Sequence, residues 1–223
     1  MSALFPDEVA DYLKHNPGFF EQYADLMAQV FVPHPHGGRA ISLAERQMLS
    51  LREKTRASEA KLAELIAFGE ENDAISEKVH RLAVGLVAAE TFQAVIHLLD
   101  FHLRDDFAVP HVALRLWHKP EGVADLPEFA AVSEELQVFA ETLGRPYCGS
   151  TAGFGTASWF GEHALLIRSQ ALIALRNSGG TIGMIALGSE DAQRFYAGMG
   201  TLYLERLGEM ASAALARVGK SAP

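Results

Sequence analysis

The sequence predicts an α+β fold in which helices flank an antiparallel β-sheet, preceded by a long N-terminal helix and short helices. The clearest indication is the stretch 170–217, where the apolar runs QALIALR and TIGMIALGS are joined by the short polar turn NSGG. Both runs are apolar on both faces, which is typical of strands that are covered on each side of a sheet. A long amphipathic pattern follows and predicts a helix that packs on this hairpin at once.

The turn of the predicted hairpin consists of Asn177, Ser178, Gly179 and Gly180. These residues tolerate the positive φ angles that primed two-residue turns require, so we expect such a turn here. The closing helix is expected to carry one apolar stripe, formed by Phe195, Met199, Tyr203, Leu207, Met210, Ala214 and Val218. Further apolar residues outside this stripe favour an additional helical partner.

Other elements follow from periodicity and from breaker residues. Residues 5–32 predict two short helices separated at Asn16, and the segment PHPHGGRA after them predicts a loop. Thr91 suits the N-cap of a helix over residues 92–103. We also expect a strand over 111–117, a helix over 127–143, a loop over 145–163 and a strand over 164–167.

A long helix is expected to begin at Ser42, because Ser42 and Glu45 have the spacing of a capping box. From Met48 to Leu86, core-type positions at 3-4 spacing are apolar at both ends and polar in the middle. This seam predicts a homodimeric coiled coil, with a helix packed on its own domain as the alternative. The predicted seam residues are Met48, Leu51, Leu62 and Leu65.

The expected domain organisation has four parts: short helices and a loop over residues 1–40, a dimerisation helix over 41–75, a compact α+β domain over 76–218 and a disordered tail over 219–223. No apolar run approaches the roughly 20 residues that cross a bilayer. The acidic start also differs from a secretory signal. The sequence therefore predicts a cytoplasmic protein with no membrane partner.

Charge and cysteine content exclude several classes of function. The net charge of −9 argues against direct nucleic-acid binding, which needs clustered Lys and Arg. Cys148 is the only cysteine, which excludes an internal disulfide and a thiolate metal cluster. The histidines lack ligand spacing, since His34 and His36 lie in a Pro/Gly loop and His97 and His102 are five residues apart on a helix. No metal site is predicted, and any cofactor stays unidentified.

Five segments carry a resemblance to a known family: YLKHNPGFF at 12–20, VPHPHGGRAISLAERQMLSLREK at 32–54, RPYCG at 145–149, LGSEDAQRF at 187–195 and MGTLYLERLGE at 199–209. On these motifs the chain resembles the bacterial family catalogued as domain-of-unknown-function family 484, and its element order resembles the GAF-like fold. The resemblance implies a GAF-like sensor domain with an N-terminal helical extension and no established activity. Family members are often encoded beside a site-specific tyrosine recombinase, which implies a protein partner of that kind.

Better-understood GAF subgroups match the sequence poorly. Cyclic-nucleotide-binding GAF domains carry an Asn-Lys…Phe…Asp-Glu signature that this sequence lacks. Bilin-binding GAF domains often place the chromophore-bearing Cys before a His, whereas Cys148 precedes Gly149. A third subgroup reduces free methionine sulfoxide with cysteine thiols. Cys148 near Arg145 keeps that activity as an alternative, although a single cysteine needs an external thiol for regeneration.

A ligand pocket is predicted around the loop 145–161. Its aromatic residues and the polar residues of neighbouring strands combine apolar walls with a few polar groups, as small-molecule sites do. The alternative is that the aromatic side chains fill the core, and no catalytic residue is predicted. The candidate ligand-binding residues are Arg115, Tyr147, Cys148, Trp159, Phe160 and Ser169.

The sequence thus predicts a non-enzymatic GAF-like sensory module that binds a small molecule or a protein partner and acts as a homodimer. Two alternatives stay open. The first is a thiol-dependent oxidoreductase, similar to methionine sulfoxide reductases, that uses Cys148. The second is a ligand-free scaffold or accessory protein linked to site-specific recombination.

Overall fold

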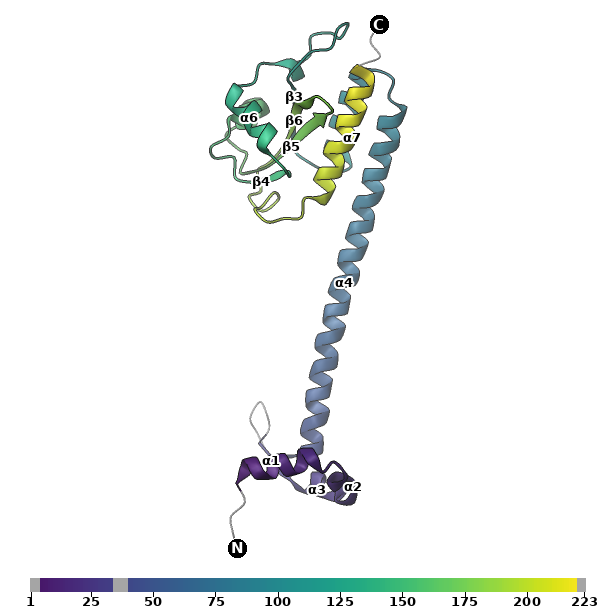
Figure 1. Cartoon of the computed structure of the whole chain (residues 1–223), viewed down its shortest axis with the longest axis vertical. Coiled ribbons are helices and arrows are strands. Elements are labelled where there is room, and N and C mark those ends of the chain that lie inside the picture. Colours follow the sequence, from purple (N-terminus) through teal and green to yellow (C-terminus); the bar gives the residue numbers. More distant parts are fainter. Residues whose placement is uncertain (1–4, 34–39, 220–223) are drawn as a thin grey trace. The chain divides into compact units, whose positions relative to one another are not determined.

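The computed structural model describes residues 5–33 and 40–219 (Figure 1). The chain forms two compact units, Met1–Glu70 and Glu71–Pro223. His34 and His36 lie outside the described ranges, as do residues 220–223 of the predicted tail. Gly219, the first residue of that tail, ends the last helix.

The first unit contains three short helices where two were expected: α1 (Pro6–His15), α2 (Gly18–Gln22) and α3 (Ala24–Gln29). The break after Asn16 is confirmed, and a second break falls at Tyr23, which has non-helical φ and ψ of −119° and 42°. A short antiparallel ladder then leads to the long helix. It joins β1 (Phe31–Val32) to β2 (Ile41–Ser42).

The long helix α4 (Leu43–Ala88) begins where the sequence predicts and continues past the expected end at residue 75. The backbone N–H of Glu45 donates to Ser42 Oγ at 3.2 Å, so Ser42 caps the helix as expected. Leu86 is only 3% exposed and packs in the core of its own domain, so the predicted seam does not extend to it. The four named seam residues are exposed: Met48 52%, Leu51 61%, Leu62 58% and Leu65 55%.

The second unit is built on a four-stranded antiparallel sheet with the strand order β3-β6-β5-β4. The predicted hairpin and the predicted strand over 111–117 are both confirmed. The strand expected over 164–167 is wrong. Leu165 there is 98% exposed, and a local turn forms in which the N–H of Leu166 donates to His163 O at 2.9 Å. The strands are β3 (His111–Leu116), β4 (Tyr147–Gly149), β5 (Ser169–Asn177) and β6 (Gly180–Ser189).

The hairpin turn differs from the expected primed type. Asn177 pairs with Gly180, which leaves Ser178 and Gly179 as the turn residues. Of these four residues only Gly180 has a positive φ, 119°, whereas a type I′ turn needs positive φ at both central residues. The N–H of Gly179 instead donates to Asn177 Oδ1 at 2.8 Å, so the asparagine side chain stabilises the turn.

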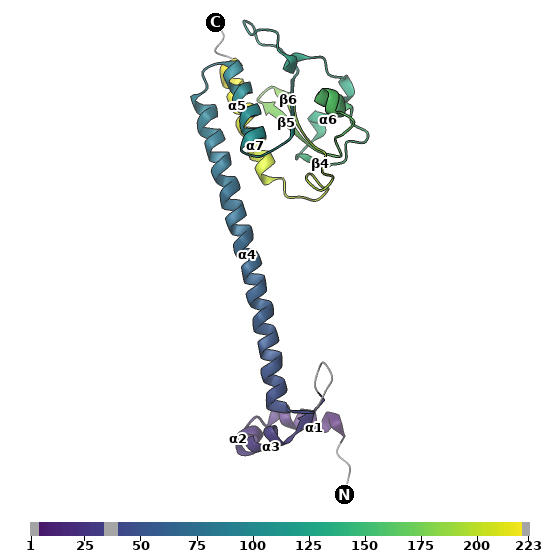
Figure 2. The ribbon, with the colours of Figure 1, turned by 180° about the vertical axis from the view of Figure 1, so that it is seen from behind.

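One face of the sheet packs against α5 (Phe92–Asp105) and α7 (Leu202–Gly219) (Figure 2). The C-terminal part of α4 packs on these two helices and shares their core. Thr91 Oγ1 accepts the N–H of Ala94 at 3.2 Å, which confirms the predicted N-cap of α5. Alternate residues of the two central strands enter this first core, among them Ile173, Leu175, Ile185 and Leu187.

The opposite face is covered by α6 (Glu134–Thr142) and the 3₁₀ segment η2 (Gly155–His163). The second core lies here, with Phe160 of η2 and Ala140 of α6 buried in it. The central strands are therefore covered on both sides, and the predicted α+β class is confirmed. The residues of the two central strands in this second core are Leu172, Ala174, Met184 and Ala186.

The single helix expected over 127–143 is divided into the 3₁₀ turn η1 (Pro127–Phe129) and α6. Phe129 stacks on Phe92 in the first core, with ring centroids 5.7 Å apart, whereas Ala140 is buried in the second core. The chain must cross from one face of the sheet to the other between them. A 3-4 spacing of apolar residues cannot reveal this crossing, because it does not indicate which face each residue contacts.

The closing helix begins later than expected, since α7 starts at Leu202 and excludes Phe195 and Met199. Gly198 has a φ of 90°, a left-handed conformation that a continuous α-helix cannot contain. Phe195 is nevertheless only 5% exposed. The apolar spacing therefore predicted the burial of this segment correctly and its helical conformation wrongly.

Candidate functional site

The structure separates the two β4 residues among the candidates. Tyr147 and Cys148 are neighbours on the strand, so their side chains point to opposite faces of the sheet. Tyr147 packs on Phe154 in the second core with ring centroids 4.7 Å apart, whereas Cys148 is buried in the first core. Burial raises the pKa of the Cys148 thiol to about 11.

Two further candidates stabilise the fold locally. Ser169 Oγ donates to Asp191 O at 2.6 Å and accepts the N–H of Phe195 at 3.3 Å, so it fixes the turn after β6. Phe160 is buried in the second core, where its ring lies so close to Gly188 that a Cβ there would be 2.9 Å from Phe160 Cζ.

Arg115 and Trp159 are the two candidates that the structure brings together. Arg115 lies on β3 and Trp159 on η2, and the guanidinium carbon of Arg115 is 5.4 Å from the centre of the Trp159 ring. This distance is within the range of a cation–π interaction. One guanidinium nitrogen also donates to Leu114 O at 2.8 Å, which fixes the side chain along the strand.

These two residues border a pocket of about 350 Å³ beside β3, the edge strand of the sheet. Helix α5 supplies an apolar wall that includes Ile96 and Leu99, and η1 supplies Pro127 and Glu128. The volume is at the small end of the roughly 300–1,000 Å³ that ligand sites occupy. The pocket therefore suits a small molecule.

Two charged residues of this pocket, Asp100 and Arg104, bind each other, whereas Arg115 does not bind a carboxylate among the described residues. Asp100 Oδ1 accepts from Arg104 Nε at 2.8 Å, and the Arg104 guanidinium also donates to Pro110 O at 3.0 Å. Within the part of the chain that the structure describes, Arg115 forms no ion pair with a carboxylate. Burial lowers the pKa of Arg115, and the negative charge of Glu128, which also lines the pocket, opposes that change. An anionic group bound here would compensate a cation that is partly removed from water.

Sequence reasoning missed a buried polar pair under η2. Thr156 Oγ1 donates to Gln170 Oε1 at 2.7 Å, and both residues are 0% exposed. Among the residues that the structure describes, the amide nitrogen of Gln170 finds no hydrogen-bond partner, which is costly for a buried donor. The detectable signal was a glutamine inside the apolar run that forms β5.

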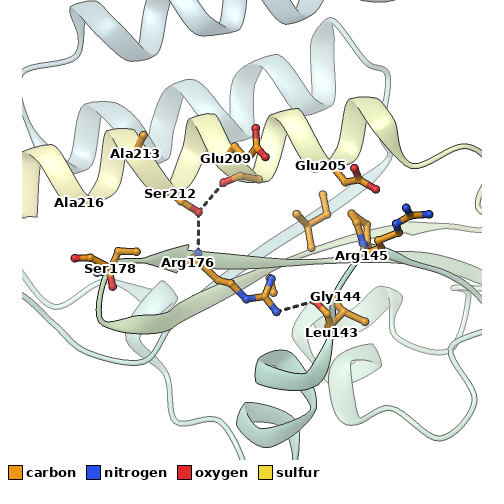
Figure 3. Close-up of a pocket in the computed structure, with 15 residues that line it drawn as sticks. Leu143, Gly144, Arg145, Arg176, Ser178, Glu205, Glu209, Ser212, Ala213 and Ala216 are labelled. Atoms are coloured by element: carbon orange, nitrogen blue, oxygen red, sulfur yellow. Dashed lines mark hydrogen bonds between the residues drawn. The ribbon is translucent and has the colours of Figure 1, made fainter.

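A second, larger hollow of about 550 Å³ lies between β5, α7 and the segment before β4 (Figure 3). Its innermost cation is already bound, because the Arg176 guanidinium donates to Ala140 O and to Leu143 O, each at 2.7 Å. These carbonyls belong to the C-terminal end of α6, which favours a cation. The backbone N–H of Arg176 donates to Ser212 Oγ at 2.9 Å. We name this hollow the α7 groove, and its polar centre serves the fold.

The described ranges contain no group of three His, Cys, Asp or Glu residues that could hold a metal ion. His111 and His163 are the nearest to such a cluster, with ring centroids 4.7 Å apart and Glu190 Oε1 3.6 Å from His111 Nε2. None of the described helices is both long and apolar enough to cross a membrane.

Comparison with known proteins identifies relatives of the chain. The sequence profile of the family described as "Protein of unknown function, DUF484" matches residues 1–219. The chain is 27% identical over 209 residues to the uncharacterized protein YigA of Salmonella typhimurium strain LT2, an alignment that covers 91% of this chain and 87% of that protein.

Two solved structures are similar to part of the chain. One is the native GAF domain of the potassium sensor histidine kinase KdpD from Escherichia coli, with a TM-score of 0.41 and 14% identity over 66% of this chain and 96% of that one. The other is the free methionine-R-sulfoxide reductase from Neisseria meningitidis in complex with its substrate, with a TM-score of 0.46 and 16% identity over 66% of this chain and 92% of that one.

Proposed function

Because the chain belongs to the DUF484 family of proteins of unknown function, we propose a function from its own site. The protein is a non-enzymatic sensory module that binds a small molecule beside Arg115 and Trp159 and acts as a homodimer. One observation carries the proposal. Arg115 is a partly buried cation over an aromatic ring, at the border of a pocket of about 350 Å³, and lacks an ion-pair partner among the described residues.

The pocket is preferred to the larger α7 groove on electrostatic grounds. In the groove, Arg176 is already bound to the carbonyls of Ala140 and Leu143, and Arg145 is exposed to solvent. An exposed cation gains little from a ligand, because water already solvates it. Arg115 gains more, because burial has removed part of its hydration.

A route for a signal leads from the pocket wall to α4. Helix α5, which lines the pocket, is tied to α4 through Asp106, whose carboxylate accepts from Arg81 at 2.9 Å and lies 2.6 Å from His102 Nδ1. Leu82 and Leu86 of α4 pack in the same core as α5. A ligand that shifts α5 would therefore act on α4, the helix that carries the predicted dimer seam.

The dimer proposal rests on exposed apolar side chains of α4. In addition to the four predicted seam residues, Ile66 is 54% exposed and Phe68 is 51% exposed. A second copy of the helix that covers this row would remove large apolar side chains from water. Within this proposal the protein is cytoplasmic, which fits a chain whose single cysteine is buried and free.

Mass spectrometry of small molecules released from the purified, denatured full-length protein tests the ligand proposal. We expect a molecule that the wild type releases and that Arg115→Ala releases at least about tenfold less, since contacts to a charged group contribute about 1.5–3 kcal/mol. Arg145→Ala, in the α7 groove, is the matched control and should release the wild-type amount. If Arg115→Ala and Arg145→Ala released equal amounts of the molecule, Arg115 would not be part of the binding site.

The ligand-free scaffold is the second candidate, and one observation favours it. Phe160 is buried and Tyr147 packs on Phe154, so side chains of the predicted site fill much of the second core. A scaffold should release no small molecule from the wild type in the same experiment. The thiol oxidoreductase alternative is disfavoured, because a buried thiol with a pKa of about 11 is a poor nucleophile at neutral pH.

A further inference from the structure

Two opposite charges face the same pocket without forming an ion pair. Arg115 and Glu128 both line the pocket beside β3, and the carboxylate of Glu128 attracts the Arg115 guanidinium from a distance. Within the described ranges, no hydrogen bond or ion pair joins Glu128 to another residue. The lining of the pocket thus contains one cation and one anion that do not bind each other.

The other charged residues of the pocket are already neutralised. Asp100 and Arg104 bind each other at 2.8 Å, and Arg104 also donates to Pro110 O at 3.0 Å and Val112 O at 3.2 Å. Among the described charged residues of the pocket, Arg115 and Glu128 are the two without an ion-pair partner. A ligand therefore meets one positive and one negative group. A ligand with only negative charge would be repelled by Glu128, and one with only positive charge would be repelled by Arg115.

The remaining wall is mainly apolar. Ile96, Leu99 and Leu103 of α5 line the pocket on one side, and the Trp159 ring lines it on another. These surfaces suit a hydrocarbon or thioether group. Ligand sites range from about 300 to 1,000 Å³. The pocket of about 350 Å³ is at the lower limit of that range, which favours a ligand smaller than a nucleotide.

We propose that this pocket binds a small zwitterion, an α-amino acid with an apolar side chain, with its carboxylate on Arg115 and its ammonium group on Glu128. The side chain lies against the α5 wall and the Trp159 ring. This inference deepens the proposed function and rests on it, since it names the ligand class of the same pocket.

The experiment titrates the full-length protein, freed of bound molecules by refolding, with each of the twenty standard amino acids and follows binding by calorimetry. For the tightest binder, two analogues are compared: the carboxylic acid that lacks the amino group and the amine that lacks the carboxyl group. We expect an apolar amino acid to bind, and each analogue to bind at least about tenfold more weakly.

Two charge-neutral variants locate the two ends of the ligand. Glu128→Gln should weaken binding of the amino acid at least about tenfold and leave the affinity for the carboxylic acid unchanged or higher. Arg115→Gln should weaken binding of both. Arg145→Gln and Glu209→Gln, in the α7 groove, are matched controls and should bind the amino acid like the wild type. Equal unfolding temperatures would show that the variants fold.

The outcomes separate the two proposals. If no amino acid binds, or if the carboxylic acid binds as tightly as the amino acid and Glu128→Gln has no effect, the zwitterion proposal is overturned. A different molecule whose release depends on Arg115 would then still support the sensory function. If no molecule binds in an Arg115-dependent manner, both proposals fail.

Discussion

At the scale of the residue, Cys148 is buried in the first core, and this burial lowers the reactivity of its thiol. Burial raises the pKa of the thiol to about 11. At pH 8 only about one thiol in a thousand is ionised at such a pKa, compared with roughly a quarter at the ordinary value near 8.5. The thiolate is the nucleophile, so the folded protein should react slowly with alkylating reagents.

This prediction is checked by following iodoacetamide labelling of the full-length protein at pH 8 with mass spectrometry. Labelling in the native state should be at least about a hundredfold slower than in urea, where the thiol has its ordinary pKa. Equal rates in the two states would show that Cys148 is accessible and would revive the thiol-enzyme alternative.

The candidate site was predictable from the sequence only in part. Arg115 and Trp159 were named and do lie together, because an alternating strand and a Gly-rich aromatic loop are local signals. The loop predicted over 145–161 puts Tyr147 and Cys148 in one site, whereas the side chains of neighbouring residues on a strand point to opposite faces. Glu128 was missed, because only the tertiary fold brings η1 beside β3.

At the scale of the element, the contact between α7 and β5 depends on Gly208. A Cβ at this position would lie 2.6 Å from Ile173 Cγ2, so alanine would force the helix away from the strand. Overpacking of this kind costs about 1–3 kcal/mol. Alanine gains about 1 kcal/mol of helix propensity over glycine, which offsets only part of that cost.

We therefore expect Gly208→Ala to lower the free energy of unfolding by up to about 2 kcal/mol in a urea titration. Gly200→Ala is the control, since a Cβ at Gly200 meets no atom within 4 Å and its φ is not positive. That variant should unfold like the wild type or slightly later. A stabilised Gly208→Ala protein would contradict the close packing of α7 on the sheet.

The contribution of the contact between α4 and α5 to the free energy of unfolding should depend on pH, because the carboxyl group of Asp106 takes part in this contact. The hydrogen bond with His102, followed by that with Arg81, holds the pKa of the Asp106 carboxyl below its ordinary value. A carboxylate with a lowered folded-state pKa stabilises the fold fully above its unfolded pKa of about 3.9. That contribution is lost as the pH falls through the folded-state pKa.

Asp106→Asn should accordingly lower the free energy of unfolding by about 1 kcal/mol at pH 7 and show a weaker loss of stability below about pH 4. Urea titrations at pH 7, 4 and 3 measure both effects. Asp105→Asn, at the neighbouring exposed position, is the control and should follow the wild type. Parallel pH profiles for Asp106→Asn and the wild type would show that this contact does not stabilise the fold.

Most elements were predictable because their signals are local. The two central strands, the Thr91 cap and the start of α4 each depend on a few adjacent residues, and each was found as expected. The division of 127–143 and the late start of α7 were not predictable from apolar spacing. The first requires knowing that η1 and α6 contact opposite faces of the sheet, and the second depends on the backbone conformation of Gly198.

At the scale of the whole molecule, the proposed dimer depends on exposed apolar residues of α4. The double substitution of Leu62 and Leu65 by Glu places charges on the proposed seam and should convert a dimer into a monomer. Ala60→Glu, at an exposed position outside the seam, should stay dimeric. Size-exclusion chromatography with light scattering measures the mass of each protein. A wild type that stays monomeric at high concentration would exclude the seam.

The proposed function has two parts, a dimer and a small molecule held at Arg115. Native mass spectrometry of the full-length protein tests both parts in one spectrum. We expect a wild-type dimer that carries the added mass of a small molecule, an Arg115→Ala dimer without that mass and an Arg145→Ala dimer that retains it. A wild type that appears as a ligand-free monomer, or an added mass that persists in Arg115→Ala, would contradict it.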